Sequence, residues 1–392
     1  MNSESGIERT AHAKDSFDEQ FRRVHTMNLP RPDGTPGVDV GITLVRPEKP
    51  KEGLPVFFAP SWSMTVKDIY GYALRELYDS GRSIITCDPV REGGEPHWTE
   101  TESRRLAQLQ ALDVTLPPEE LRAAHTLIRV LEHVRPTGQK TNVLGHSRGF
   151  GYAVIAAALR PDLIANVQGY GPAGLIGKDS FLSIAMRLAS QDPSKIEWEA
   201  LPTSDVTLRQ LAEAKLADMP GIAPENRDTE RTRIYEDLRA KKEAAAARGL
   251  YEYAKPTVQQ REAAQLVGGK AIGVLMKYIF SPLRLGRIWR AAKEAWGLSR
   301  IRVDALLPEL RKAGVGVAIA TGEEDSVFAA DRVREHAGTK AMQEAGVFMT
   351  TIQGEHGLVG EDRRAVAMCE GTFTMLEHTQ GNRAQERLPE HH

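Results

Sequence analysis

A serine flanked by glycines is the part of this sequence best suited to chemistry. The segment Gly145-His146-Ser147-Arg148-Gly149 follows a short apolar run and precedes an alanine-rich stretch of helical composition. Strand, tight turn and helix form the context in which a GxSxG segment presents a nucleophilic serine. A serine at the apex of such a turn crowds its neighbours, so glycines are expected two residues to either side. Ser147 is therefore the candidate nucleophile, with the N-terminus of the next helix beneath it to stabilise negative charge.

The elements around this serine alternate along the chain. Continuous apolar runs predict strands that are buried on both faces, and helical spacing predicts the helices between them. The predicted elements are, in order, strands at 21–28, 38–46 and 55–59, a helix at 67–79, a strand at 83–87, a helix at 117–135, the strand and helix around Ser147, and a strand at 164–170. This alternation predicts a mostly parallel sheet with helices on both faces.

The second half of the chain predicts an insertion. From 172 to 308 the pattern is helical only, and the alternation then resumes with a strand at 315–321, a helix at 329–345, a strand at 347–352 and a helix at 362–378. We therefore expect an all-helical cap inserted into one α/β domain. The expected division is a disordered tail at 1–20, the first part of the core at 21–171, the cap at 172–308, the second part of the core at 309–378, and a tail at 379–392.

Composition narrows the classes of function. The chain has 51 Lys and Arg against 53 Asp and Glu, a net charge of −2, which gives no long-range attraction to nucleic acid. No apolar run reaches the 18 residues of a membrane span, and the N-terminus lacks the apolar centre of a signal peptide. The two cysteines fit a reducing cytoplasm, and no metal or cofactor motif is present. We expect a cytoplasmic protein without a cofactor or metal.

One glycine-rich segment needs a separate interpretation. Residues 169–174 read GYGPAG and match GxGxxG after a strand. The dinucleotide fingerprint opens the first strand–helix unit of its domain, whereas this segment contains a proline and leads into the cap. We interpret it as the hinge of the cap.

With these elements in place, the chain resembles the α/β-hydrolase superfamily. The resemblance covers roughly 36–171 and 309–378, and it rests on the GHSRG elbow and on the loops that follow two late strands. In that family the catalytic triad follows the chain order serine, acid, histidine. The resemblance implies Asp325 as the acid, in the loop after 315–321, and His356 as the base, in the Gly354-Glu355-His356-Gly357 loop.

The expected oxyanion hole departs from the family pattern. Many relatives have His-Gly after the third strand, whereas this chain has Ala59-Pro60-Ser61-Trp62. Pro60 has no N–H to donate. The resemblance therefore implies the Trp62 N–H as one donor, with Ser61 as the alternative, and the Arg148 N–H as the other.

Together these residues predict a serine hydrolase that forms an acyl-enzyme. Apolar side chains of the cap favour a small-molecule ester or thioester substrate with an apolar acyl or alcohol part. The same triad also serves acyltransferases and hydrolases of carbon–carbon bonds, and the scaffold could instead be a ligand-binding receptor. A homodimer formed through the cap is one arrangement that the sequence allows.

Overall fold

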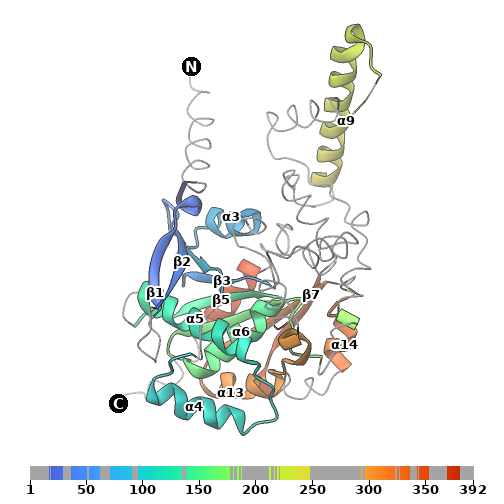
Figure 1. Ribbon diagram of the computed structural model, residues 1–392. Helices are drawn as coiled ribbons and strands as arrows, with labels where there is room; N and C mark the ends of the chain where they lie inside the picture. Colours follow the sequence, from blue (N-terminus) through green and yellow to red (C-terminus); the bar gives the residue numbers. More distant parts are fainter. Residues whose placement is uncertain are drawn as a thin grey trace, which may run out of the picture.

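The protein folds around an eight-stranded sheet, seen edge-on in the computed structural model (Figure 1). The structure describes residues 17, 19–29, 37–50, 53–61, 71–90, 96–134, 138–176, 180, 183–184, 187, 212, 216, 219, 221–247, 293, 296–322, 325, 327–335, 342, 344–352 and 369–379. Its strands are β1 (His25–Leu29), β2 (Val38–Val45), β3 (Val56–Ala59), β4 (Ile84–Cys87), β5 (Thr141–His146), β6 (Ile164–Tyr170), β7 (Gly316–Gly322) and β8 (Phe348–Ile352). Its helices are α3 (Gly71–Asp79), α4 (Glu100–Gln110), α5 (Pro118–Val134), α6 (Arg148–Leu159), η1 (Pro224–Asn226), α9 (Arg227–Ala247), η3 (Asp304–Leu306), α13 (Leu307–Lys312) and α14 (Ala330–Glu335), and residues 369–379 form a last helix.

The strand order places a change of winding direction in the middle of the sheet. The order is β1-β2-β4-β3-β5-β6-β7-β8; β2 is antiparallel to both of its neighbours, and β3 to β8 are parallel. From β3 the chain moves outward to β4, and from β5 it moves the other way to β6. β3 and β5 are neighbours, so their carboxyl ends flank the switch point, which is where parallel α/β sheets bind ligands.

Each face of the sheet has its own apolar core. On one face, α5, α6 and α13 cover residues such as Phe57, Val143 and Val167. On the other face, α3 and the last helix cover a second cluster that includes Phe58 and Leu144. Successive residues of a strand point to opposite faces. The prediction of a mostly parallel sheet with helices on both faces is confirmed.

The chain begins differently from the expected strand at 21–28. Residues 21 and 22 are helical, and β1 begins only at His25. Phe21 stacks on Phe17 with ring centroids 5.4 Å apart, and Phe17 meets Tyr78 of α3 edge-on at 5.2 Å. Aromatic residues four apart share one side of a helix, and this pair packs that side against α3. The core therefore reaches upstream of residue 21.

The insertion at 172–308 is described only in part. Residues 183, 184, 187, 212 and 216 are helical, as the sequence predicts, and so is the charged helix α9, which extends away from the sheet (Figure 1). Four apolar residues between 212 and 238 form a small separate cluster. Residues 248–292 of the insertion, which the sequence predicts to be helical, lie outside the described residues.

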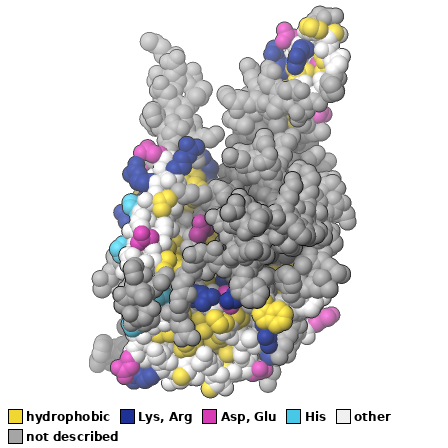
Figure 2. All heavy atoms as spheres, in the orientation of Figure 1, with side chains coloured by type: hydrophobic (Ala, Val, Ile, Leu, Met, Phe, Trp, Pro, Cys, Tyr) yellow, Lys and Arg dark blue, Asp and Glu magenta, His cyan; other side chains and the backbone are white. Residues whose placement is uncertain are grey.

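The described surface has no single-sign field of charge on the face shown in Figure 2. Basic and acidic side chains of the described residues are interspersed there, in keeping with the net charge of −2. No helix among the described residues is long and apolar enough to cross a membrane. Both cysteines are buried thiols, and burial raises the pKa of Cys369 to about 12 and that of Cys87 further still. Neither is a nucleophile at neutral pH.

Candidate active site

Ser147 sits on a strained turn between β5 and α6. Its backbone has φ 52° and ψ −116°, and among the described residues it is the one non-glycine with positive φ. Such a conformation costs about 1–3 kcal/mol and persists only where the surroundings enforce it. Here the Ser147 N–H donates to the carbonyl of Tyr170 (2.8 Å), and its own carbonyl accepts from Phe150 N (3.1 Å) and Ala173 N (3.2 Å). Hydrogen bonds with α6 and with residues 170–173 therefore hold the serine in its turn.

The glycines of the elbow are required by close contacts. A Cβ built at Gly145 would lie 2.5 Å from the backbone nitrogen of Phe150, and one at Gly149 would lie 2.0 Å from the carbonyl oxygen of Ala59. Gly169 of β6 belongs to the same arrangement, because a Cβ there would lie 2.3 Å from the Phe150 ring. The three glycines let the first turn of α6 pack directly on the sheet and on the end of β3.

The first glycine of the GYGPAG segment thus makes room for Phe150. The next two, Gly171 and Gly174, have φ of 47° and +91° and turn the chain away from β6. The three glycines therefore act through the backbone: the first leaves room for the Phe150 ring, and the other two let the chain turn.

Asp325 lies in the loop after β7 and is buried, with 2% of its surface exposed. Its Oδ1 accepts hydrogen bonds from the backbone N–H groups of Val327 (2.9 Å) and Phe328 (2.7 Å). These bonds fix the orientation of the carboxylate. Because β5 and β7 are parallel and separated by one strand, Asp325 and Ser147 both lie beyond the carboxyl edge of the sheet.

The remaining predicted site residues are placed only in part. His356 and Trp62 lie outside the described residues. The strand before His356, β8, pairs with β7, and its last residue Ile352 is in register with Gly322. Ser61, the alternative donor, is buried just after β3. The described structure therefore brings together Ser61, Ser147, Arg148 and Asp325 at one edge of the sheet, and the triad as a whole remains a prediction.

The side chain of Arg148 makes a buried ion pair that the sequence analysis does not anticipate. Its Nε donates to Oε1 of Glu120 at 2.7 Å, and its Nη2 donates to the carbonyl of Glu119 at 3.2 Å. The side chains of Arg148 and Glu120 are almost fully buried, at 3% and 0% exposure. A signal was present: an arginine that opens an otherwise apolar helix needs a partner charge, and the acidic first turn of α5 offers one.

His146, next to the nucleophile, packs within the protein. Its ring is buried and meets the ring of Tyr170 edge-on, with centroids 6.0 Å apart. The His146 ring therefore packs against the end of β6. Among the described residues no group of three or more His, Cys, Asp or Glu side chains is placed to hold a metal ion.

No protein-family model matches the chain, and no curated protein matches it either. Several solved structures are similar at low identity. A thermophilic esterase from Thermogutta terrifontis has 14% identity and a TM-score of 0.47, covering 90% of this chain and 99% of its own. A hydrolase from Pseudomonas aeruginosa PA01 has 14% identity and a TM-score of 0.47, covering 89% and 98%. The 2-hydroxy-6-oxo-6-phenylhexa-2,4-dienoate hydrolase of Rhodococcus sp. strain RHA1 has 12% identity and a TM-score of 0.45, covering 90% and 100%.

Likeness at this level says nothing about substrate or mechanism. The strand order and the serine elbow are sufficient to assign the architecture. A sheet of eight strands with β2 antiparallel, and a positive-φ serine between β5 and α6, define an α/β-hydrolase fold.

Proposed function

We propose that the protein is a serine hydrolase that cleaves a carboxylic ester or thioester with an apolar portion. The observation that carries this proposal is the strained, positive-φ Ser147 at the switch point of the sheet. Strain of this kind is retained at sites of function. The buried Asp325, held by two backbone N–H groups beyond β7, gives it support.

The proposed chemistry follows from the three side chains. His356 takes the proton from the Ser147 hydroxyl as its oxygen attacks the substrate carbonyl, and Asp325 orients the imidazole and stabilises its cation. The tetrahedral oxyanion accepts hydrogen bonds from the Arg148 N–H and from the N–H of Trp62 or Ser61, each contributing about 3 kcal/mol. His356 then protonates the leaving alcohol or thiol. Water, deprotonated by the same histidine, hydrolyses the acyl-enzyme.

We further propose that 172–308 forms a cap over this site. Support comes from the two ends of the insertion, which run side by side: the Val303 N–H donates to the Gly174 carbonyl at 3.1 Å. The outgoing end also packs on the nucleophile helix, because a Cβ at Gly151 would lie 2.4 Å from Ile301 Cδ1. An insertion whose ends meet beside the elbow is well placed to line a substrate pocket.

The test is the release of p-nitrophenol from acyl esters of increasing chain length. Ser147→Ala is expected to lower kcat by more than about 10,000-fold, because the nucleophile of an acyl-enzyme pathway is lost. Ser80→Ala is the matched control. Ser80 lies just after α3, and its hydroxyl donates to the carbonyl of Leu77 in that helix. A fluorophosphonate should label native Ser147, whose oxygen displaces fluoride at phosphorus.

Near-native turnover by Ser147→Ala would overturn the proposal. Labelling of Ser147 without turnover of any ester would keep an activated serine and point to acyl transfer or carbon–carbon cleavage. If the protein is neither labelled nor turns over any ester, and it binds a ligand saturably, the receptor alternative is established.

A further inference from the structure

A buried tyrosine joins the nucleophile helix to the loop that follows β3. Tyr152 of α6 is 1% exposed, and its hydroxyl donates to the carbonyl of Pro60 at 3.1 Å. The same two segments touch through their backbones, since Gly149 lies against the carbonyl of Ala59. The loop after β3 is therefore held against the first turn of α6 at two points.

The carbonyl that Tyr152 holds belongs to a particular peptide group. The Pro60 carbonyl and the Ser61 N–H share one planar unit, and in a trans peptide they point in opposite directions. No cis peptide occurs among the described residues. Fixing the Pro60 carbonyl toward Tyr152 therefore also fixes the direction of the Ser61 N–H.

Tyr152 also contacts Arg148, the residue whose backbone N–H is the other proposed oxyanion donor. The Arg148 guanidinium lies over the Tyr152 ring, 6.0 Å from its centroid, and is anchored on Glu120 of α5. The side chain of Arg148 meets the ring of this tyrosine, and the loop after β3 meets its hydroxyl. Tyr152 therefore contacts both the residue that carries one donor and the loop that carries the other.

We propose that Tyr152 is a positioning residue for the oxyanion hole, its hydroxyl holding the Pro60–Ser61 peptide so that the loop after β3 donates to the oxyanion. The inference rests on the proposed function and goes beyond it, because Tyr152 lies outside the GHSRG elbow and the two late loops that suggest the triad. It touches neither the substrate nor the reacting atoms. Its contribution appears only where negative charge develops on oxygen, which is in the transition state.

Tyr152→Phe tests this by removing one oxygen atom and keeping the ring. A misdirected donor is expected to lower kcat by about 10- to 100-fold. KM for a p-nitrophenyl ester should stay within about threefold, because the ground state does not carry the charge. The affinity for an alkylboronic acid, which forms a tetrahedral adduct on the serine, should fall by the same factor as kcat/KM.

Tyr78→Phe is the matched control, a buried tyrosine of α3 on the opposite face, packed on Phe17. It should leave all three quantities unchanged. The first-order rate of fluorophosphonate labelling of Ser147 is measured beside them, because this rate does not depend on how much of the variant is folded. It should fall for Tyr152→Phe and not for Tyr78→Phe.

Outcomes separate the two proposals. If native Ser147 is labelled and Tyr152→Phe keeps its kcat, boronate affinity and labelling rate within about twofold of native, the positioning role is wrong and the serine hydrolase stands. A variant that loses only thermal stability leads to the same conclusion. If native protein neither turns over esters nor labels, the proposed function fails and the role of Tyr152 fails with it.

Discussion

At the scale of single residues, the backbone of Ser147 is more informative than its side chain. A serine at φ 52° and ψ −116° occupies a region that glycine enters without penalty. The chain keeps a serine there, at a position where glycine would avoid the backbone strain. Stability given up at one residue is the expected mark of a functional position.

This strain predicts an order of stability for two inactive variants. Ser147→Gly should be more stable than Ser147→Ala by about 1 kcal/mol, because release of about 1–3 kcal/mol of backbone strain outweighs the roughly 0.5–1 kcal/mol entropy cost of glycine. Both variants lack the hydroxyl, so the comparison isolates the backbone. Urea denaturation of the two proteins measures the difference. If the alanine variant proves the more stable, Ser147 is not strained.

The residues of the elbow were predictable because their signal is local. Gly145, Ser147 and Gly149 lie within one short segment, and sterics alone relate them. Tyr152 and Glu120 were not predictable, because Tyr152 reaches the loop after β3 only once α6 packs on the sheet, and Glu120 reaches Arg148 only once α5 and α6 pack together. A tyrosine in an apolar helix gives no indication of which carbonyl its hydroxyl will reach.

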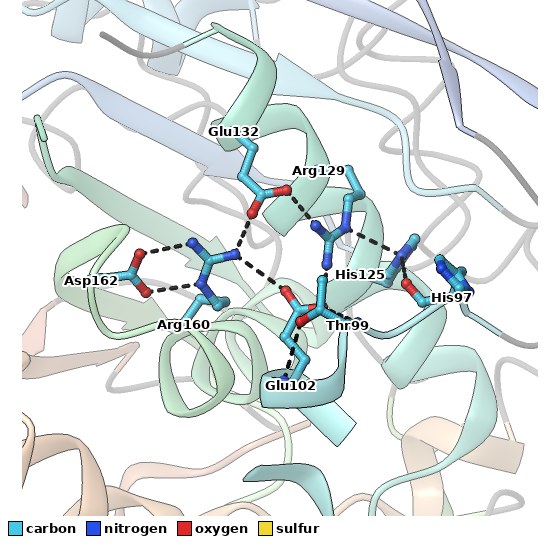
Figure 3. A network of polar contacts seen from close by, with 8 residues as sticks. All are labelled: His97, Thr99, Glu102, His125, Arg129, Glu132, Arg160 and Asp162. Atoms are coloured by element: carbon cyan, nitrogen blue, oxygen red, sulfur yellow. Dashed lines mark hydrogen bonds and ion pairs between the residues drawn. The ribbon is translucent and has the colours of Figure 1, made fainter. Parts of the chain in front are cut away.

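At the scale of elements, α4 is held by charges beside a short apolar contact, in which Leu109 is buried in the core. Its sequence, ETESRRLAQLQ, has little that predicts burial, yet a capping box of Thr99 and Glu102 begins it. The fully buried Glu102 then pairs with Arg129 of α5 and with Arg160 at the end of α6 (Figure 3). The capping box could have been read from the sequence, but the helix was missed because its anchor is ionic.

Burial alone would raise the pKa of Glu102, but the Thr99 N–H and the two arginines outweigh burial and lower it. Glu132 joins both arginines on their outer side, and Asp162 holds Arg160 (Figure 3). Three helices are thereby fixed to one another. Through Arg160, this network anchors the C-terminal end of the nucleophile helix α6 to α4 and α5.

His125 makes the same network sensitive to pH. Figure 3 shows its contacts with the His97 carbonyl and with Arg129. Its Nε2 lies 3.0 Å from the His97 carbonyl oxygen and 3.3 Å from Nε of Arg129. Burial, and then the charge of Arg129, lower the pKa of His125 to about 4 from its ordinary 6.5, although the hydrogen bond to the His97 carbonyl and the charges of Glu102 and Glu132 oppose the shift. The folded protein therefore keeps this ring neutral where the unfolded chain would protonate it. Because the unfolded chain binds this proton first, the free energy of unfolding falls as the pH drops from 6.5 towards 4. Above pH 6.5 both states are neutral at His125 and this loss is absent.

Between about pH 7.5 and pH 5 the native protein should lose about 2 kcal/mol more than His125→Gln does. The measurement is the free energy of unfolding in urea at the two pH values. His133→Gln, at an exposed position of the same helix, is the control and should behave as the native protein does. Equal slopes for native protein and His125→Gln would show that His125 does not titrate in this range.

At the scale of the whole molecule, the order of strands and helices was largely predictable, because buried parallel strands are continuous apolar runs. β5, α6 and β6 fall where the sequence predicts them. The pairing of distant segments was not predictable. It depends on contacts such as that of Phe17 with Tyr78, and on the helix at 369–379 reaching back to residues near the start of the sheet.

That last helix both covers one face of the sheet and neutralises a buried cation. Phe373 is buried in the cluster around Phe58, and Glu370 and Glu377 bind Arg82 at 2.8 Å and 2.6 Å. Glu377 also accepts from the side chain of Asn142 at 2.6 Å. Arg82 is 1% exposed in its side chain, so loss of both partners would leave a buried charge uncompensated.

Truncation after residue 368 should therefore prevent folding. The truncation removes both carboxylates that neutralise Arg82 and uncovers the apolar cluster beneath the helix, whereas a typical domain is stabilised by only about 5–15 kcal/mol. Truncation after residue 379 is the matched control, since the sequence predicts a tail beyond the helix, and it should keep the native Tm and the labelling of Ser147. Circular dichroism and thermal unfolding distinguish the two proteins. A folded, active product of the shorter truncation would mean that the sheet is complete without its final helix, and that Arg82 finds compensation elsewhere.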